Sequence, residues 1–124
     1  MNKYYKYIIF IVLVGIVSCY DPTEDIPTVC FTLSRDTLQV GDTLYLYDCS
    51  DCRGITVQWG DSVKSYTDSY TYDKGQSGNH TFRHIYGDTG RFVIRVSVYK
   101  TMQRGLDWGA TFRYAEGYDT ILVQ

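Results

Sequence analysis

Short alternations of apolar and polar residues, separated by turns of glycine and aspartate, run through most of the chain after residue 27. The clearest alternation places apolar side chains at Phe92, Ile94, Val96 and Val98. A period of two puts successive side chains on opposite faces of a β-strand, whereas a helix repeats about every 3.6 residues. The sequence therefore predicts half-buried strands, and no stretch has a convincing helical period.

Turn signals divide this region into about seven short strands. Gly41-Asp42, Gly60-Asp61 and Gly87-Asp88 each follow an alternating stretch, and such pairs favour turns. Aspartate makes up 12 of the 14 acidic residues and, like the 11 glycines, disfavours helices, whereas the 13 tyrosines suit strands. The sequence predicts one all-β domain over residues 28–124, an immunoglobulin-like β-sandwich.

The first 18 residues are typical of an export signal. Lys3 and Lys6 precede an apolar run of ten residues from Ile8 to Val17, and the small residue Ser18 follows. The run is short for about 30 Å of hydrocarbon, and an uncleaved helical anchor is the alternative. Without Lys3 and Lys6, 10 basic residues face 14 acidic ones, a net charge of −4. We expect no nucleic-acid partner, because such partners require a basic surface.

The end of the apolar run, Ile16-Val17-Ser18-Cys19, resembles a bacterial lipobox. The resemblance implies that residues 1–18 are a lipoprotein signal peptide, cut before Cys19, and that Cys19 carries fatty-acyl chains such as palmitate. Each buried methylene contributes about 0.8 kcal/mol, so two or more chains anchor a protein stably. We therefore expect a membrane contact through an N-terminal lipid anchor, with residues 19–27 as an acylated tether.

Three acidic residues follow Cys19 directly, at Asp21, Glu24 and Asp25. They resemble the export signal of surface-exposed lipoproteins in Bacteroidota, and a solvated acidic linker is the alternative interpretation. The resemblance implies a lipid-anchored location at the cell outer membrane, exposed on the cell surface.

Several stretches of the body together resemble the PKD domain, a family of immunoglobulin-like sandwiches. They are Gly41-Asp42-Thr43-Leu44, Trp59-Gly60-Asp61-Ser62, His84-Ile85-Tyr86, the alternation from Phe92 to Val98, and the final Ile121 and Val123. Ser62 replaces a glycine of the family pattern, and the segment 101–118 is longer than usual. From the residues themselves, we expect Trp59 and Phe92 to pack between the two sheets. Tyr86 resembles a tyrosine corner, whose buried ring bonds its hydroxyl to the backbone.

Three cysteines remain once Cys19 is acylated, and an oxidising compartment favours one disulfide. If residues 38–41 turn the chain into an antiparallel pair, Leu33 opposes Leu46, and Cys30 then opposes Cys49. Cys30–Cys49 is therefore the first choice. Pairings of Cys52 with either of the others remain open.

A metal site is a weaker alternative. The spacing of Cys49 and Cys52, followed by His80 and His84, is superficially similar to a Cys₂His₂ zinc site. Residues four apart on a strand are about 13 Å apart, however, too far to bind one ion. We expect no metal and no cofactor, with a loop calcium site at residues 48 and 51 as a minor possibility.

No catalytic motif is found. The chain lacks a Gly-x-Ser-x-Gly elbow, a phosphate-binding loop and a His-Glu-x-x-His pair, and its aspartates cluster in turns, where they cap backbone groups. The sequence predicts a protein that is not an enzyme.

The segment 101–118 is the main candidate for a binding surface, because aromatic residues and arginine are enriched in interface anchors. Its candidate residues are Arg104, Trp108, Phe112, Arg113, Tyr114 and Tyr118. The alternative is an extra hairpin whose aromatic rings form a local core.

These features predict a lipid-anchored, non-catalytic protein of the cell envelope that binds other proteins in an outer-membrane assembly. A surface module that binds polysaccharide is the second interpretation, since aromatic rings also stack on sugars.

Overall fold

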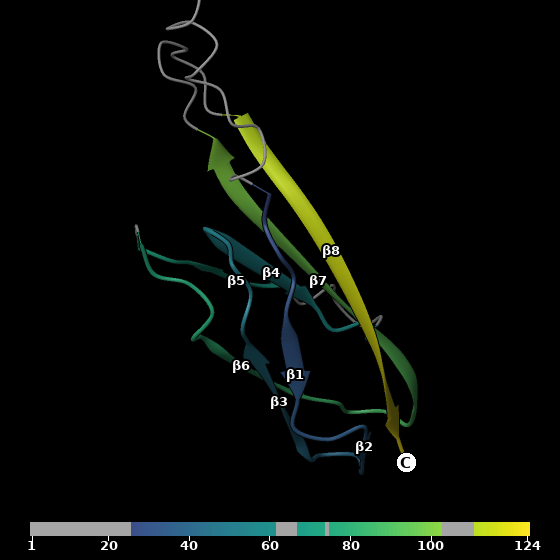
Figure 1. The fold of residues 1–124 in the computed structure, drawn as a ribbon. Helices are drawn as coiled ribbons and strands as arrows, with labels where there is room; N and C mark the ends of the chain where they lie inside the picture. Colours follow the sequence, from purple (N-terminus) through teal and green to yellow (C-terminus); the bar gives the residue numbers. More distant parts are fainter. Residues whose placement is uncertain (1–25, 62–66, 74, 103–110) are drawn as a thin grey trace, which may run out of the picture.

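A computed structural model describes residues 26–61, 67–73, 75–102 and 111–124. These residues form two β-sheets that face each other, so the predicted all-β sandwich is confirmed (Figure 1). The signal segment, Cys19, Ser62, Arg104 and Trp108 lie outside the described residues.

The smaller sheet has three antiparallel strands in the order β1-β3-β6. They are β1 (Phe31–Leu33), β3 (Thr43–Asp48) and β6 (Thr81–Ile85). Leu33 stands opposite Leu46, as the turn argument predicted.

The larger sheet has five strands in the order β2-β8-β7-β4-β5. They are β2 (Thr37–Leu38), β4 (Gly54–Gln58), β5 (Thr67–Thr71), β7 (Gly90–Met102) and β8 (Thr111–Val123). The described residues thus hold eight strands where about seven were expected. The short β2 crosses from the first sheet to the second and pairs parallel to the end of β8.

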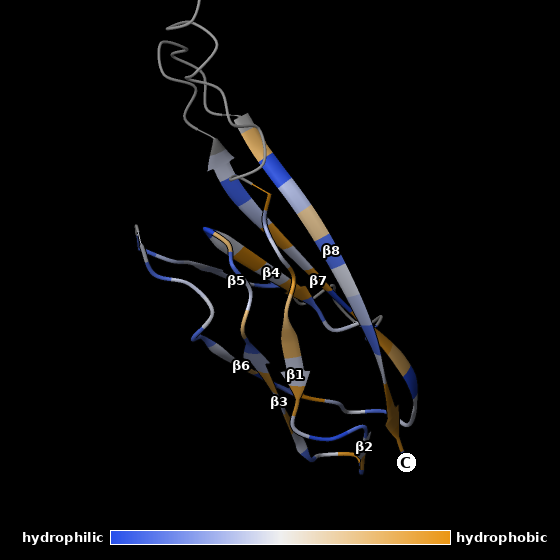
Figure 2. Cartoon of the chain, in the orientation of Figure 1, coloured by the Kyte–Doolittle hydropathy of each residue, from blue (hydrophilic) through white to orange (hydrophobic). Residues whose placement is uncertain are grey.

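The core lies between the sheets and follows the period-two pattern of the sequence. Leu44 and Leu46 point inward from β3, and the alternate residues of β7 meet them from the other side. Ile94, Val96 and Val98 are all fully buried. Figure 2 shows hydrophobic residues at the C-terminal end of β8, where Ile121 and Val123 belong to the same core. Burial of each such side chain contributes about 1.5–3 kcal/mol, which makes this alternation the main stabilising feature.

The turn after β4 gives a physical reason for the Trp59-Gly60 sequence. Gly60 has a φ of +82°, and a side chain there would collide with the carbonyl oxygen of Val93. Trp59, just before it, is buried and donates a hydrogen bond from its indole nitrogen to Asp68 at 2.7 Å. Trp59 therefore packs between the sheets as predicted, because glycine lets the chain turn close to β7.

The last strand is much longer than expected. The apolar residues Ile121 and Val123 indicated only the end of this strand, but β8 begins at Thr111 and pairs with β7 without interruption along its whole length. Arg113, Glu116 and Gly117 break the apolar alternation there, so the strand pattern is weak. Pairing with β7, rather than a buried apolar face, holds this part of β8 in place.

Candidate binding surface

The hairpin of β7 and β8 carries a group of aromatic side chains on its outer face, which points away from the core. Tyr99 and Tyr114 stand directly opposite each other, with ring centroids 6.2 Å apart. Phe112 lies 5.8 Å from Tyr99 and 6.4 Å from Tyr114 by the same measure. We call these three residues the aromatic cluster. Phe112 is 47% exposed and Tyr114 is 68% exposed, so the rings contact each other and solvent.

The backbone of β4 shapes this cluster. Gly54 stands opposite Tyr99, and a side chain at Gly54 would occupy the position of the Tyr99 ring. Tyr99 therefore lies flat across β4, and only glycine leaves room for it. No sequence pattern had identified Tyr99 or Gly54 as part of a surface, because their contact depends on the register of β4 against β7.

A polar patch adjoins the cluster on the same face. Arg95 forms an ion pair with Glu116, and Tyr118 donates a hydrogen bond to the other oxygen of Glu116 at 2.8 Å. The hydrogen bond from Arg95, followed by that from Tyr118, lowers the pKa of Glu116, so this carboxylate stays ionised. The outer face thus presents exposed rings next to fixed charges and hydroxyl groups.

The inner face of the same hairpin is different. Ala115 packs against the core, and a side chain at Gly117 would lie 2.8 Å from the Cγ1 atom of Val29. Among the predicted site residues, Phe112, Tyr114 and Tyr118 share the outer face, whereas Arg113 points to the inner side and is half-buried. The hairpin is therefore present, but its described aromatic rings are exposed and do not form a local core.

The described chain begins near the free end of this hairpin. Thr28 exchanges backbone hydrogen bonds of 3.1 Å with Asp51, and Asp51 accepts a hydrogen bond of 2.7 Å from the amino group of Lys100 on β7. Lys100 lies one residue beyond Tyr99, toward the hairpin end. Residue 26 thus starts at the same end of the molecule as the aromatic cluster (Figure 1).

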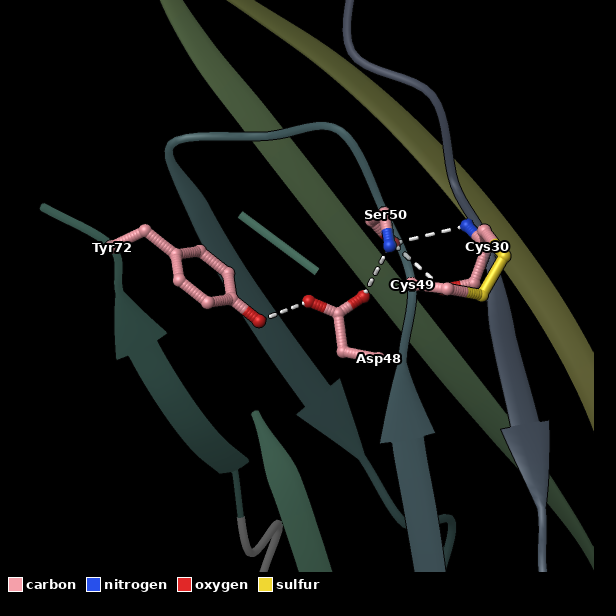
Figure 3. The surroundings of a disulfide bond; sticks show 5 residues. All are labelled: Cys30, Asp48, Cys49, Ser50 and Tyr72. Atoms are coloured by element: carbon pink, nitrogen blue, oxygen red, sulfur yellow. Dashed lines mark hydrogen bonds between the residues drawn. A yellow bond between two sulfur atoms is a disulfide. The ribbon is translucent and has the colours of Figure 1, made fainter. Parts of the chain in front are cut away.

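The disulfide joins Cys30 and Cys49, as the strand register predicted. Both cysteines are exposed, and a buried polar network lies beside them (Figure 3). Asp48 accepts hydrogen bonds from the backbone nitrogen of Ser50 and from the hydroxyl of Tyr72. These bonds satisfy a buried carboxylate and fix the turn that carries Cys49.

Cys52 is the free cysteine of the described chain, and it is buried. Burial, with the negative charges of Asp48 and Asp51 adding to it, raises the pKa of its thiol to about 12. The thiol is therefore protonated at neutral pH and is a poor nucleophile.

The residues weighed as metal ligands have other partners. Cys49 is in the disulfide, and the His80 ring stacks on the Tyr70 ring. The His84 ring stacks on Trp59, and its Nε2 atom lies 2.7 Å from a carboxylate oxygen of Asp61. Within the ranges that the structure describes, no group of three metal-binding side chains comes together. No helix in the same ranges has the length and apolarity to cross a bilayer.

No family model matches this sequence, and no curated protein matches it either.

Proposed function

We propose that this chain is a lipid-anchored, non-catalytic protein of the bacterial cell envelope, with a PKD-like domain that binds another outer-membrane protein. The observation that carries the proposal is the aromatic cluster. Tyr99, Phe112 and Tyr114 place contacting rings on an exposed sheet face, beside the ion pair of Arg95 and Glu116. Tyrosine, phenylalanine and arginine are enriched where proteins bind each other.

The position of the cluster supports a membrane-bound partner. If Cys19 is acylated, residues 19–25 extend over at most about 25 Å before the described chain begins. That chain begins at the hairpin end, near Lys100. The short tether would hold the aromatic cluster close to the bilayer, where other outer-membrane proteins are within reach.

The anchor is tested by the substitution Cys19→Ala in the full-length protein. Without acylation the product should no longer sediment with lipid vesicles that contain no protein, because it carries no acyl chain. Continued sedimentation of Cys19→Ala with such vesicles would contradict the anchor and leave the binding surface untouched.

The surface is tested by a paired substitution, Phe112→Ala with Tyr114→Ala, in the anchored protein. We expect membrane proteins that co-purify from detergent-solubilised membranes to be lost, as quantified by mass spectrometry. The matched control replaces Tyr45 and Tyr47, which are 40% and 46% exposed on the smaller sheet. Equal recovery of partners from both variants would overturn the proposal.

Glycan binding is the second candidate, because exposed rings beside Arg95, Glu116 and Ser97 also suit a sugar. The same two variants separate the candidates in an affinity gel that contains polysaccharide. If the gel retains the native protein but not the variant of Phe112 and Tyr114, glycan binding is favoured over a protein partner.

A further inference from the structure

Among the described residues, the edge of β8 that faces away from β7 is open over most of its length. β2 pairs with it only at Leu122 and Val123, and no other described strand pairs with residues 111–121 on that side. The remaining strands at the sheet ends have five residues or fewer. Proteins usually shield a long edge, because its unpaired backbone groups can add a further strand.

The pairing with β2 shows which backbone groups point out of this edge. The backbone nitrogen of Leu122 donates to Asp36 at 3.0 Å, and that of Gln124 donates to Leu38 at 2.8 Å. Backbone groups alternate in direction along a strand, and the β7 pairing is continuous, so the other even-numbered residues share this orientation. The outward groups therefore belong to Phe112, Tyr114, Glu116 and Tyr118. Thr120 has the same orientation, and its nitrogen donates to its neighbour Asp119 at 2.8 Å.

The nearest chain segment leaves the edge open. Val29 and Phe31 contact the position of Gly117 from the inner face. Their own strand forms its backbone bonds on the other side, where Thr28 pairs with Asp51 and the carbonyl of Cys30 accepts a bond from Cys49. This segment therefore covers the face of β8 and does not extend its sheet.

We propose that this open edge of β8 binds the same edge of a second copy of the chain, in an antiparallel pair related by a two-fold axis. Two five-stranded sheets would become one continuous sheet, and the outer faces of both copies would stay exposed. The contact is made by the backbone of β8 and goes beyond the function proposed for the aromatic cluster, although Phe112 and Tyr114 belong to both surfaces.

Geometry limits the possible registers, and charge favours one with its axis at Ala115. Outward backbone groups of one copy must face outward backbone groups of the other, so even-numbered residues pair with even-numbered residues. With the axis at Ala115, Phe112 stands opposite Tyr118 of the second copy, and Tyr114 stands opposite Glu116. Thr111 then ends opposite Asp119, before the edge is taken by β2. Moving the axis to Glu116 would place two carboxylates face to face, which is unfavourable.

The chosen register is self-complementary in its side chains. On the outer face it places the Phe112 ring opposite the Tyr118 ring, and Tyr114 opposite the carboxylate of Glu116. On the inner face it brings Arg113 diagonally across from Asp119 of the second copy. Opposite charges and aromatic pairs across strands each contribute roughly 0.2–1 kcal/mol. An unrelated strand would not carry complementary groups in this order. The second copy carries them, and the two-fold axis forms each pair twice.

The test is cross-linking of the full-length protein in detergent, with Cys52→Ala as background. Ala115→Cys places two thiols on the two-fold axis, where opposing Cα atoms of a non-hydrogen-bonded pair are about 4.5 Å apart, within disulfide range. The matched control is Arg113→Cys, whose two copies would be about 14 Å apart. We expect an oxidised dimer from Ala115→Cys only. Equal cross-linking of both variants, or none of Ala115→Cys in folded protein, would overturn the proposal.

A second measurement does not depend on new cysteines. Light scattering of the native protein at about 50 µM should give the mass of a dimer, and a monomer at that concentration would overturn the proposal. Tyr114→Pro removes one outward N–H at an edge that tolerates proline, and should weaken the dimer at least about tenfold relative to Tyr114→Ala. Equal dimerisation by these two variants would also count against the backbone pairing.

Discussion

The hydroxyl of Tyr86 donates a hydrogen bond of 2.9 Å to the carbonyl oxygen of Trp59, 27 residues earlier in the chain. Both side chains are buried, and the Tyr86 ring stacks on Phe92 with centroids 4.7 Å apart. One phenol therefore joins the end of β6 to the turn after β4. This geometry confirms the tyrosine-corner prediction.

Removal of this hydroxyl should destabilise the fold measurably. In Tyr86→Phe the ring still fills the core, but the carbonyl of Trp59 loses its partner, at a cost of about 1 kcal/mol. The midpoint of urea unfolding should fall accordingly. Tyr45→Phe, which removes an exposed hydroxyl, is the control, and a midpoint unchanged in Tyr86→Phe would contradict the role assigned to the bond.

The disulfide should contribute more than any single hydrogen bond. Cys30 and Cys49 are 19 residues apart, and closing a loop of this size lowers the conformational entropy of the unfolded chain, which stabilises the folded state by about 3 kcal/mol. Replacement of both cysteines by alanine should lower the free energy of unfolding by that amount. Peptide mapping without reduction should recover the linked pair, and a bridge to Cys52 would contradict the structure.

Gly54→Ala should disturb the aromatic cluster. A methyl group there collides with the Tyr99 ring, so the ring must leave β4, at a cost of about 1–3 kcal/mol from overpacking. We expect loss of stability together with weaker partner binding. Gly87→Ala is the matched control, because its added methyl would meet no atom within 4 Å. If Gly54→Ala behaves like Gly87→Ala, Tyr99 does not lie where the structure places it.

Stability should decline in alkaline solution. Burial raises the pKa of Cys52 from 9.0 to about 12, and burial with the hydrogen bond to Asp48 raises that of Tyr72 from 10.0 to about 12. The folded state therefore holds protons that the unfolded state releases from about pH 9, and stability falls as the pH rises from there toward 12. Urea midpoints measured at pH 7 to 11 should decrease above pH 9, and a constant midpoint would contradict these shifts.

Alkylation of native protein at pH 7.5 should spare Cys52 until urea unfolds the chain.

The fold was predictable where one local pattern determined both the strand and its buried face. Ile94, Val96 and Val98 gave β7, and the parity of Leu33 and Leu46 gave the register and the disulfide. The parallel pairing of β2 could not be predicted in this way. It depends on two residues crossing between sheets, and neither has a distinctive local pattern.

The candidate surface was predictable only in part. Phe112, Tyr114 and Tyr118 stood out as aromatic residues in a long segment, and the structure puts all three on one exposed face. Tyr99 directly follows the alternation that ends at Val98, and Gly54 has no side chain to suggest a surface. Their contact arises when β4 is paired with β7, which no local pattern encodes.

The position of the Cys30–Cys49 bond has a mechanical consequence. The bond links the segment that enters the fold to β3, the central strand of its sheet. Tension applied at the N-terminus would therefore pass into β3 through sulfur, and the three residues of β1 would not have to bear the load through hydrogen bonds. A domain tethered by its first residues could be pulled hard without its edge strand peeling away.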